Sequence, residues 1–423
     1  MVLTGKLKPK EVLYLTALAL YVGAALFQST YLFNLLFSVD DSVYVAMKMI
    51  RYAAYFLCLT RFILEYKTSK NRIITAILLL LFSVIVGILG TDKGAIFYVL
   101  MILGAYDIDF RNIVKVFISL QGITILFCLI CALFFDIGGE TIIQNARYRS
   151  FLGFGWVNRA AYIWLGVFLE YIYLRRGRIH LGENIFFMVF ALWIYYKTKT
   201  KFAFGGMLLV VAFSLMRSLW MKLKHTKQYE IKSIYFVINR KSKYRRRKIN
   251  RLDGIILMGC AIIGIGLCLC YKENINILYS LNKLVTYRLS LGHDAITKYG
   301  LSLFGHDTVW TGASTLMWNQ SGSSVYEYVD CAYLVLALDY GLLYLFFVLM
   351  CYLLGIKSAN AFENVEVKYI LLFYGMLSVF EPRLLDFTMN PFVLYGISTY
   401  KLLKRNENIL FEQILRRKRN EMV

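Results

Sequence analysis

The chain has 423 residues, of which 59% are hydrophobic and only 17% are charged. A soluble chain of this length needs a far more polar surface, so the composition excludes an ordinary soluble protein. The formal charge of +22 could indicate nucleic-acid binding, but the basic residues lie in short stretches between long apolar runs. That is the pattern of membrane topology, and no nucleic-acid partner is expected.

Long apolar runs follow one another along the sequence. Runs of about 18 residues predict membrane-spanning helices, and the three prolines leave these helices uninterrupted. We therefore expect an all-α polytopic membrane protein of about twelve transmembrane helices, built as a single membrane domain over 1–423. The predicted spans are 12–33, 43–64, 73–90, 94–106, 114–135, 158–174, 183–197, 203–220, 254–271, 331–356, 368–380 and 391–403. Four of them fall below about 17 residues, which predicts ends that are non-helical or shielded by protein.

The basic residues orient the predicted spans. They concentrate near the N-terminus, in 175–180, in the loop 221–253 and in the tail 404–423. These segments share one side if the spans alternate, and the positive-inside rule makes that side cytoplasmic. The prediction is a multi-pass protein of the cytoplasmic membrane with both termini in the cytoplasm.

Two longer segments fall on the opposite, extracytoplasmic side. They are the loops 136–157 and 272–329, and the second is much the longer. Long loops in a chain otherwise made of tight turns are usually functional. We therefore expect chemistry or binding to occur outside the membrane.

The first outer loop offers cations for an anionic ligand. Arg147 and Arg149 stand close before a predicted span, and Gly153 and Gly155 permit a close approach of backbone and ligand. Guanidinium groups suit phosphate, and a pyrophosphate needs more than one cation. Lys201 is a further cation on the outer side. The alternative is that these side chains extend to lipid headgroups.

The second outer loop contains Arg288 and two His-Asp pairs, His293-Asp294 and His306-Asp307. A metal site would need three or four ligands, and no spacing here fixes them, so no metal is expected. A histidine could act as a general base, although a surface or capping role is an open alternative for either.

Charged residues also stand at the mouths of the predicted spans or inside them. Asp330 lies at an outer mouth, with Tyr333 three positions later on the expected helix face, and Asp339 lies deeper. A carboxylate within a span usually faces a cavity or a partner. The remaining ones are expected to pair with one another structurally: Lys48, Arg51, Glu381 and Arg383.

Three segments together resemble the oligosaccharide repeat-unit polymerases of bacterial surface polysaccharides, the Wzy-type, O-antigen-polymerase-like family. RYRSFLGFGWVN is similar to the family's arginine-containing loop, and TYRLSLGHDAITKYGLSLFGHD to its Arg-Leu loop that leads to Leu-Phe-Gly. YVDCAYLVLALDYGLLYLFF is similar to its Asp-x-x-Tyr helix start. The two-loop layout covers the whole chain. Thr200-Lys201 departs from the Ser-Arg often present in related polymerases and ligases, and lysine cannot form a bidentate fork.

The resemblance implies a substrate and a reaction. The donor would be a polysaccharide chain on undecaprenyl pyrophosphate, and the acceptor the next lipid-linked repeat unit. A sugar hydroxyl attacks the anomeric carbon and undecaprenyl pyrophosphate leaves, without a nucleotide sugar, metal or cofactor. Implied partners are the undecaprenyl-pyrophosphate-linked oligosaccharide, membrane lipid, and a chain-length regulator and flippase of the same pathway.

Candidate residues then take roles in this reaction. Cations beside the departing pyrophosphate lower the barrier, and these would be Arg147, Arg149, Arg288 and Lys201. His306 is the first candidate for the base, followed by Asp330 and His293. The residues that could contact sugars are Tyr326, Tyr328, Tyr333, Trp310 and Trp318, although Tyr and Trp also belong at membrane interfaces.

Three alternatives remain open at this point. A lipid-linked oligosaccharide flippase shares the size and the substrate, but it should place polar residues near the membrane midplane. A ligase of the same fold would move finished polymer onto another acceptor. A non-catalytic membrane scaffold is the third.

Overall fold

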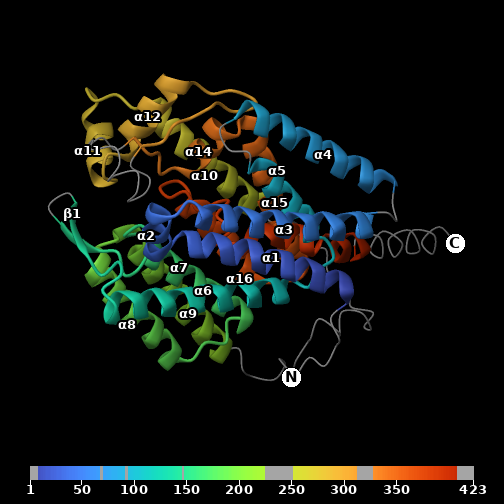
Figure 1. Ribbon diagram of the computed structural model, residues 1–423, viewed down its shortest axis with the longest axis horizontal. Coiled ribbons are helices and arrows are strands. Elements are labelled where there is room, and N and C mark those ends of the chain that lie inside the picture. The colour runs from blue at the N-terminus through green and yellow to red at the C-terminus, as the bar shows by residue number, and fades with distance from the viewer. Residues whose placement is uncertain are drawn as a thin grey trace.

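The computed structural model describes residues 8–66, 70–90, 94–144, 147–223, 251–311 and 327–406. These residues form a bundle that is almost entirely helical, and Figure 1 shows the longer helices running side by side along its long axis. The all-α class predicted from the sequence is confirmed. The one exception in the described ranges is a short β-hairpin.

The elements have these bounds: α1 (Pro9–Gln28), α2 (Tyr31–Val39), α3 (Ser42–Tyr66), α4 (Lys70–Leu89), α5 (Ala95–Gly104), α6 (Phe110–Phe134), β1 (Thr141–Gln144), β2 (Arg147–Ser150), α7 (Arg159–Leu174), α8 (Leu181–Thr198), α9 (Lys201–Leu223), α10 (Arg251–Leu269), α11 (Asn276–Leu284), α12 (Arg288–Tyr299), α14 (Ala332–Asp339), α15 (Leu342–Ala361), α16 (Val365–Leu377), the 3₁₀ helix η2 (Pro391–Leu394) and α17 (Tyr395–Ser398). The two strands pair antiparallel, with Thr141 opposite Ser150.

Six helices in the described ranges are long and apolar enough to cross a membrane: α1, α3, α6, α9, α10 and α15. This fits a helical membrane protein, but the expected number of about twelve spans is wrong. The predicted span 331–356 is divided at Gly341, whose φ of +89° breaks the helix between α14 and α15. The span 391–403 begins as a 3₁₀ turn capped by Asn390, and 12–33 is interrupted at Thr30, the N-cap of α2.

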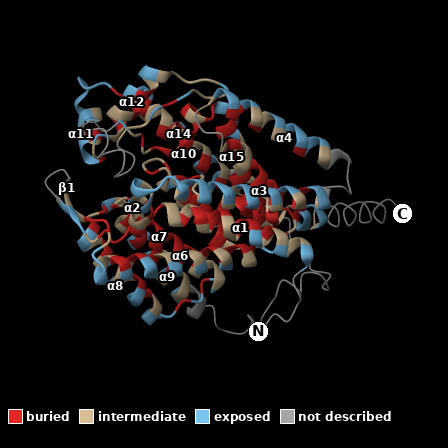
Figure 2. Ribbon diagram, viewed as in Figure 1, coloured by how far each residue is buried: buried red, intermediate tan, exposed pale blue. Residues whose placement is uncertain are grey.

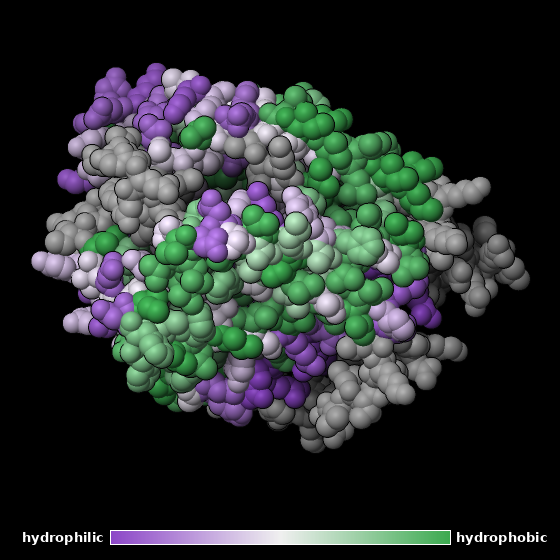
Figure 3. All heavy atoms as spheres, viewed as in Figure 1, coloured by the Kyte–Doolittle hydropathy of each residue, from purple (hydrophilic) through white to green (hydrophobic). Residues whose placement is uncertain are grey.

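The outer faces of the helices carry large apolar side chains. Phe56 of α3 is 69% exposed, Ile88 of α4 75% and Ile262 of α10 69%. In Figure 2 the buried residues lie where helices face one another, and Figure 3 shows a band of hydrophobic side chains across the visible face, with hydrophilic ones gathered over α11 and α12. Such a surface suits contact with lipid rather than water.

Contacts between sequence-distant residues define two ends of the bundle. At one, which we call the basic end, Lys10 pairs with Glu65 at 3.3 Å and Arg217 with Glu366 at 2.9 Å. At the other, the loop end, the hairpin, residues 270–311 and 327–331, and the loop 378–390 come together. The predicted outer loops, where described, thus lie opposite the predicted cytoplasmic turns. The predicted cytoplasmic loop 221–253 and tail 404–423 lie almost wholly outside the described residues.

Candidate active site

The loop 378–390 is irregular backbone that follows α16 and is held by buried side chains. The Asn390 amide donates to the carbonyls of Arg383 and Leu384, at 3.0 and 3.2 Å. The Tyr352 hydroxyl donates to the Leu384 carbonyl at 2.8 Å, and the Tyr374 hydroxyl to the Met389 carbonyl at 2.8 Å. Buried non-helical backbone is stable where protein groups satisfy its polar atoms in this way. The charged residues of the loop are therefore held in fixed positions.

Two arginines converge on one carboxylate of this loop. Asp386 Oδ2 lies 2.8 Å from Arg383 Nη1 and 3.3 Å from Nη1 of Arg159, the first residue of α7. The backbone N–H of Thr388 donates to the other oxygen, Oδ1, at 2.9 Å. The Arg383 guanidinium also lies 4.6 Å from the ring centroid of Tyr162. This group, Arg159, Arg383 and Asp386, carries a net charge of +1, and we call it the Asp386 triad.

A second group centres on Arg288, the first residue of α12. Its Nη2 lies 2.8 Å from Glu381 Oε1, and its Nε lies 3.1 Å from Asp330 Oδ2. The guanidinium also donates to the Phe380 carbonyl and lies 4.5 Å from the ring centroid of Phe202. One cation faces two carboxylates, so this Arg288 group carries a net charge of −1.

The triad and the Arg288 group adjoin in the loop 378–390. Glu381 of the Arg288 group and Arg383 of the triad are two positions apart, and the Arg383 backbone N–H donates to the Glu381 carbonyl at 2.8 Å. Tyr328 stands two positions before Asp330. The six charged residues, with three cations and three anions, therefore form one arginine–carboxylate network with a positive and a negative side.

The side chains of the network differ in how far they reach the surface. The Glu381 side chain is 2% exposed, those of Arg288 and Asp330 are 11% and 15% exposed, and that of Arg159 is 29% exposed. Arg159 is therefore the most accessible cation of the network. Glu381 can act only through Arg288, because it has almost no surface of its own.

The electrostatic setting keeps the central groups of the network charged. Burial by itself would raise the pKa of the Asp386 carboxyl, but Arg159 and Arg383 outweigh it and hold that pKa below its ordinary value. Burial would lower the pKa of Arg288, but Glu381 and Asp330 outweigh it, so the pKa of the guanidinium is raised. Both groups remain ionised at neutral pH.

The hairpin places Arg149 beside the start of α7. Its Nε donates to the Thr198 carbonyl at 2.7 Å, and its Nη2 donates to the amide oxygen of Asn158, the residue before Arg159. The Thr200 hydroxyl donates to the same oxygen at 3.2 Å. Arg149 thus ties the hairpin to the α8–α9 turn next to the network. The Arg147 side chain lies outside the described part of the chain.

Three aromatic side chains, Trp310, Tyr328 and Tyr299, form a group at the loop end, and Asp339 is hydrogen-bonded to it. Trp310 Nε1 donates to Asp339 Oδ1 at 3.1 Å, and the Thr308 hydroxyl donates to the same oxygen at 2.5 Å. The Trp310 ring centroid lies 5.9 Å from those of Tyr328 and Tyr299. Asp339 therefore faces protein partners, and it fixes the orientation of an indole ring that is partly exposed. Trp318 and Tyr326 lie outside the described residues.

The predicted histidines make contacts to other segments of the loop end. His293 Nδ1 is 3.1 Å from the Cys268 carbonyl oxygen, and its ring faces Tyr271. His306 is half-buried, and its backbone N–H donates to the Leu338 carbonyl at 2.8 Å, next to Asp339.

Two other candidates occupy different settings. The Tyr333 side chain is fully buried and donates to the Gly375 carbonyl at 2.8 Å, so it faces α16 instead of the network. The face expected to join it to Asp330 does not exist, because α14 begins only at Ala332. Lys201 is exposed at the start of α9, and its neighbour Phe202 is the residue that meets Arg288.

Sequence reasoning missed part of the network. Arg288, Asp330 and Tyr328 were candidates, and the structure brings them together. Asp386 was not considered at all, and Arg383 only as a structurally paired charge. The available signal was the segment EPRLLD, which places three charges and one of three prolines between two apolar runs.

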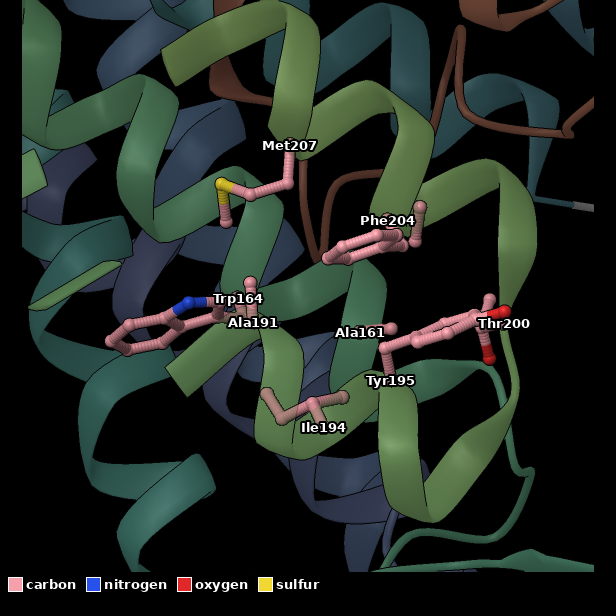
Figure 4. Close-up of a pocket in the computed structure, with 9 residues that line it drawn as sticks. Ala161, Trp164, Ala191, Ile194, Tyr195, Thr200, Phe204 and Met207 are labelled. Atoms are coloured by element: carbon pink, nitrogen blue, oxygen red, sulfur yellow. The ribbon is translucent and has the colours of Figure 1, made fainter. Parts of the chain in front are cut away.

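A separate apolar pocket lies between α7, α8 and α9 (Figure 4). Its empty volume is about 230 Å³, including space open to solvent. The lining residues are Ala161, Trp164, Ala191, Ile194, Tyr195, Thr200, Ala203, Phe204 and Met207. No charged side chain lines the pocket, so it offers no site for a phosphate.

No cluster of three or more His, Cys, Asp or Glu side chains that could hold a metal ion occurs in the described ranges. No family model matches the sequence, and no curated protein and no solved structure shows significant similarity to it. The function therefore has to be argued from the chemistry of the site itself.

Proposed function

We propose that this protein is a membrane-embedded glycosyltransferase that polymerises lipid-linked oligosaccharide repeat units. It would transfer the growing chain from undecaprenyl pyrophosphate to a sugar hydroxyl of the next lipid-linked repeat, for a capsule, exopolysaccharide or O-antigen. The observation that carries the proposal is the convergence of Arg159 and Arg383 on Asp386 at the loop end. The resemblance of the loop segments to repeat-unit polymerases supports it.

The positive side of the network suits the departing diphosphate. Two guanidinium groups share one carboxylate, so a positive charge remains for a ligand, and Arg159 is the most exposed of the three arginines. Arginine forks match phosphate oxygens geometrically, and fixed cations beside a leaving group stabilise the charge that develops on it. The fixed loop 378–390 holds Arg383 in place, which is the preorganisation that such catalysis requires.

The negative side suits the attacking hydroxyl. As the bond from the acceptor oxygen to the anomeric carbon forms, the bond from that carbon to the diphosphate oxygen breaks. The hydroxyl proton passes to a base, and the diphosphate leaves as an anion. Asp330 is our candidate base, because it is 15% exposed and one arginine, Arg288, holds it at 3.1 Å, whereas two arginines share Asp386. His306 remains the alternative base from the side of Asp339.

The aromatic group suits the sugars. Trp310, Tyr328 and Tyr299 present rings beside the network, and aromatic faces pack well against the apolar faces of sugar rings. Asp339 fixes the indole by accepting its N–H. The apolar helix surfaces would keep the isoprenoid chains in the bilayer.

The proposal includes a location and partners. The loop end would face outward from the cytoplasmic membrane and the basic end inward, with both termini in the cytoplasm, because lysines and arginines gather at the basic end. A flippase and a chain-length regulator of the same pathway would supply the repeats and end the polymer.

One observation favours a flippase instead. Glu170 of α7 and Gln121 of α6 are both fully buried, and the Gln121 amide donates to Glu170 Oε1 at 2.9 Å. Ionisable residues inside a bundle often mark transport pathways. We rank this reading second, because the pair is a single carboxyl and amide, whereas six charged side chains gather at the loop end.

Deletion of the gene and analysis of the accumulating lipid-linked glycans tests the proposal. A polymerase leaves single repeat units exposed outside, a flippase traps them inside, and a ligase leaves finished polymer on its lipid carrier. Complementation with Arg159→Gln/Arg383→Gln should reproduce the deletion phenotype, and Arg217→Gln at the basic end is the matched control. Polymer of normal length and amount from the double variant would refute the proposed mechanism.

A further inference from the structure

Two cations lie inside α3, in the half of the helix that begins at the loop end. Lys48 and Arg51 are three positions apart and share one helix face. Lys48 is exposed and lies 4.5 Å from the ring centroid of Tyr44, whereas Arg51 is half-buried. The rise from Ser42, the first residue of α3, to Arg51 is about 13 Å. Both cations therefore belong to the spanning helix and not to the turn before it.

Within the described ranges, these two cations have no acidic partner. Within the described ranges neither Lys48 nor Arg51 forms an ion pair, contrary to the pairing expected from the sequence, and Arg51 Nε is buried without a hydrogen-bond partner. Further along the same helix, Arg61 Nη1 lies 3.1 Å from Glu65. An arginine in a membrane helix without an acid of its own is costly. An anionic ligand held by Arg51 would offset this cost.

Packed aromatic rings connect this face of α3 to the Asp386 triad. Tyr52, which is 55% exposed, has its ring centroid 6.3 Å from that of Tyr55. Tyr55 lies 5.8 Å from Tyr21, and Tyr21 lies 6.1 Å from Phe387, the residue after Asp386. The two cations thus lie within three ring contacts of the network. A lipid held by Lys48 and Arg51 would therefore have its headgroup beside the network, on the surface of the bundle that faces the bilayer.

We propose that Lys48 and Arg51 bind the diphosphate of the second lipid-linked substrate, the acceptor. This inference rests on the proposed function, in which two lipid diphosphates take part and only one departs. In that function the network holds the diphosphate that leaves, and negative charge develops on this diphosphate as the reaction proceeds. The acceptor diphosphate is not cleaved, so it needs cations that bind it at the membrane face and no catalytic surroundings. Lys48 and Arg51 supply two such cations.

Lipid binding by the purified full-length protein tests the inference. The probe is undecaprenyl diphosphate in phosphatidylcholine nanodiscs, and native mass spectrometry counts the bound lipids. We expect two on the wild type and one on Lys48→Gln/Arg51→Gln, with the second binding weakened about tenfold or more by the loss of charge-assisted bonds. Lys199→Gln is the matched control, because Lys199 also lies 4.5 Å from a tyrosine ring, that of Tyr196. It should keep both lipids.

Other outcomes overturn the inference. The inference is wrong if the wild type binds only one lipid. It is also wrong if an equal amount of phosphatidylglycerol displaces the second lipid, because Lys48 and Arg51 would then be an ordinary site for anionic headgroups. Normal polymer from the double variant after loss of one lipid would refute the acceptor role. Binding does not require catalysis, so a wild type that binds two lipids but makes no polymer would refute the proposed function and leave the site standing.

Discussion

The Asp386 triad at the loop end has a close counterpart at the basic end. There, Glu65 Oε2 lies 3.1 Å from Arg61 Nη1 and 3.3 Å from Lys10 Nζ, so two cations again share one carboxylate. The net charge of +1 is the same as at Asp386, where the corresponding distances are 2.8 and 3.3 Å. A site therefore cannot be recognised from the number of ion pairs or from their lengths alone.

The surroundings of the two triads differ. Arg61 and Glu65 stand one turn apart on α3, and Arg61 Nη2 donates to the Tyr106 carbonyl at 2.9 Å, so the arginine joins neighbouring helices. Asp386 lies on irregular backbone, with a second arginine centre next to it. The comparison teaches that a second group of charged side chains beside the ion pairs, on irregular backbone, distinguishes the candidate site from a structural contact.

The largest expected effect comes from neutralising the arginines at Asp386. Arg159→Gln/Arg383→Gln keeps the approximate size of the side chains but removes the charge offered to the leaving diphosphate. We expect polymerisation to fall about 100- to 1000-fold, the range seen when preorganised stabilisation of a developing charge is removed. The measurement is the rate of polymer formation per folded molecule in reconstituted membranes. A rate within a few-fold of the wild type would mean that the Asp386 triad contributes no more to catalysis than the ion pairs at Glu65.

A smaller effect is expected from the aromatic group beside the network. Trp310→Phe keeps a ring but loses the indole N–H that donates to Asp339 at 3.1 Å. We expect weaker acceptor binding, with KM raised about two- to tenfold and kcat little changed, because the ring loses the hydrogen bond that orients it and such a bond contributes about 0.5–1.5 kcal/mol. Initial rates against acceptor concentration measure this. A fall in kcat with unchanged KM would place Trp310 in the chemistry instead.

Hydrophobicity predicted where most helices lie, but it did not predict their number as spans. The run 114–135 corresponds to α6, Phe110–Phe134, and the run 254–271 to α10, Arg251–Leu269. The run 331–356 looks equally continuous, yet it breaks at Gly341, where a Cβ would meet the Leu303 carbonyl oxygen at 2.3 Å. That break depends on packing against the segment around Leu303, which is distant in the sequence, and hydropathy cannot predict such a contact.

Part of the candidate site was visible in the sequence, and part depended on the chain folding back. Arg288 and Asp330 stand out because charges in outer loops are few. Tyr333 was selected from helical spacing, and that spacing fails because Asp330 precedes the helix. Asp386 has no local motif, and its role becomes visible only when the loop 378–390 brings it to Arg159, 227 positions away.

Neutralising Arg61 should affect stability and not chemistry. Arg61→Gln removes the buried guanidinium that lies 3.1 Å from Glu65, and it removes the donor to the Tyr106 carbonyl. We expect a loss of about 1–3 kcal/mol in the free energy of unfolding, since a buried polar group loses its partner. Thermal unfolding in detergent measures this, with the polymerisation rate per folded molecule as the second readout. A rate loss as large as that of the Asp386 variants would make the two triads equivalent.

The smallest effect is expected for Lys10→Gln, the exposed cation at Glu65. Its side chain is 45% exposed, against 3% for Arg61, so water already solvates the ammonium group. An exposed ion pair contributes about 0–1 kcal/mol, and Arg61 still neutralises the carboxylate. We expect unchanged polymer and a change in unfolding free energy near the limit of detection, measured as for Arg61→Gln. Because loss of the cations at Asp386 is expected to reduce polymer strongly, a comparable polymer defect in Lys10→Gln would show that net charge, and not its surroundings, decides activity.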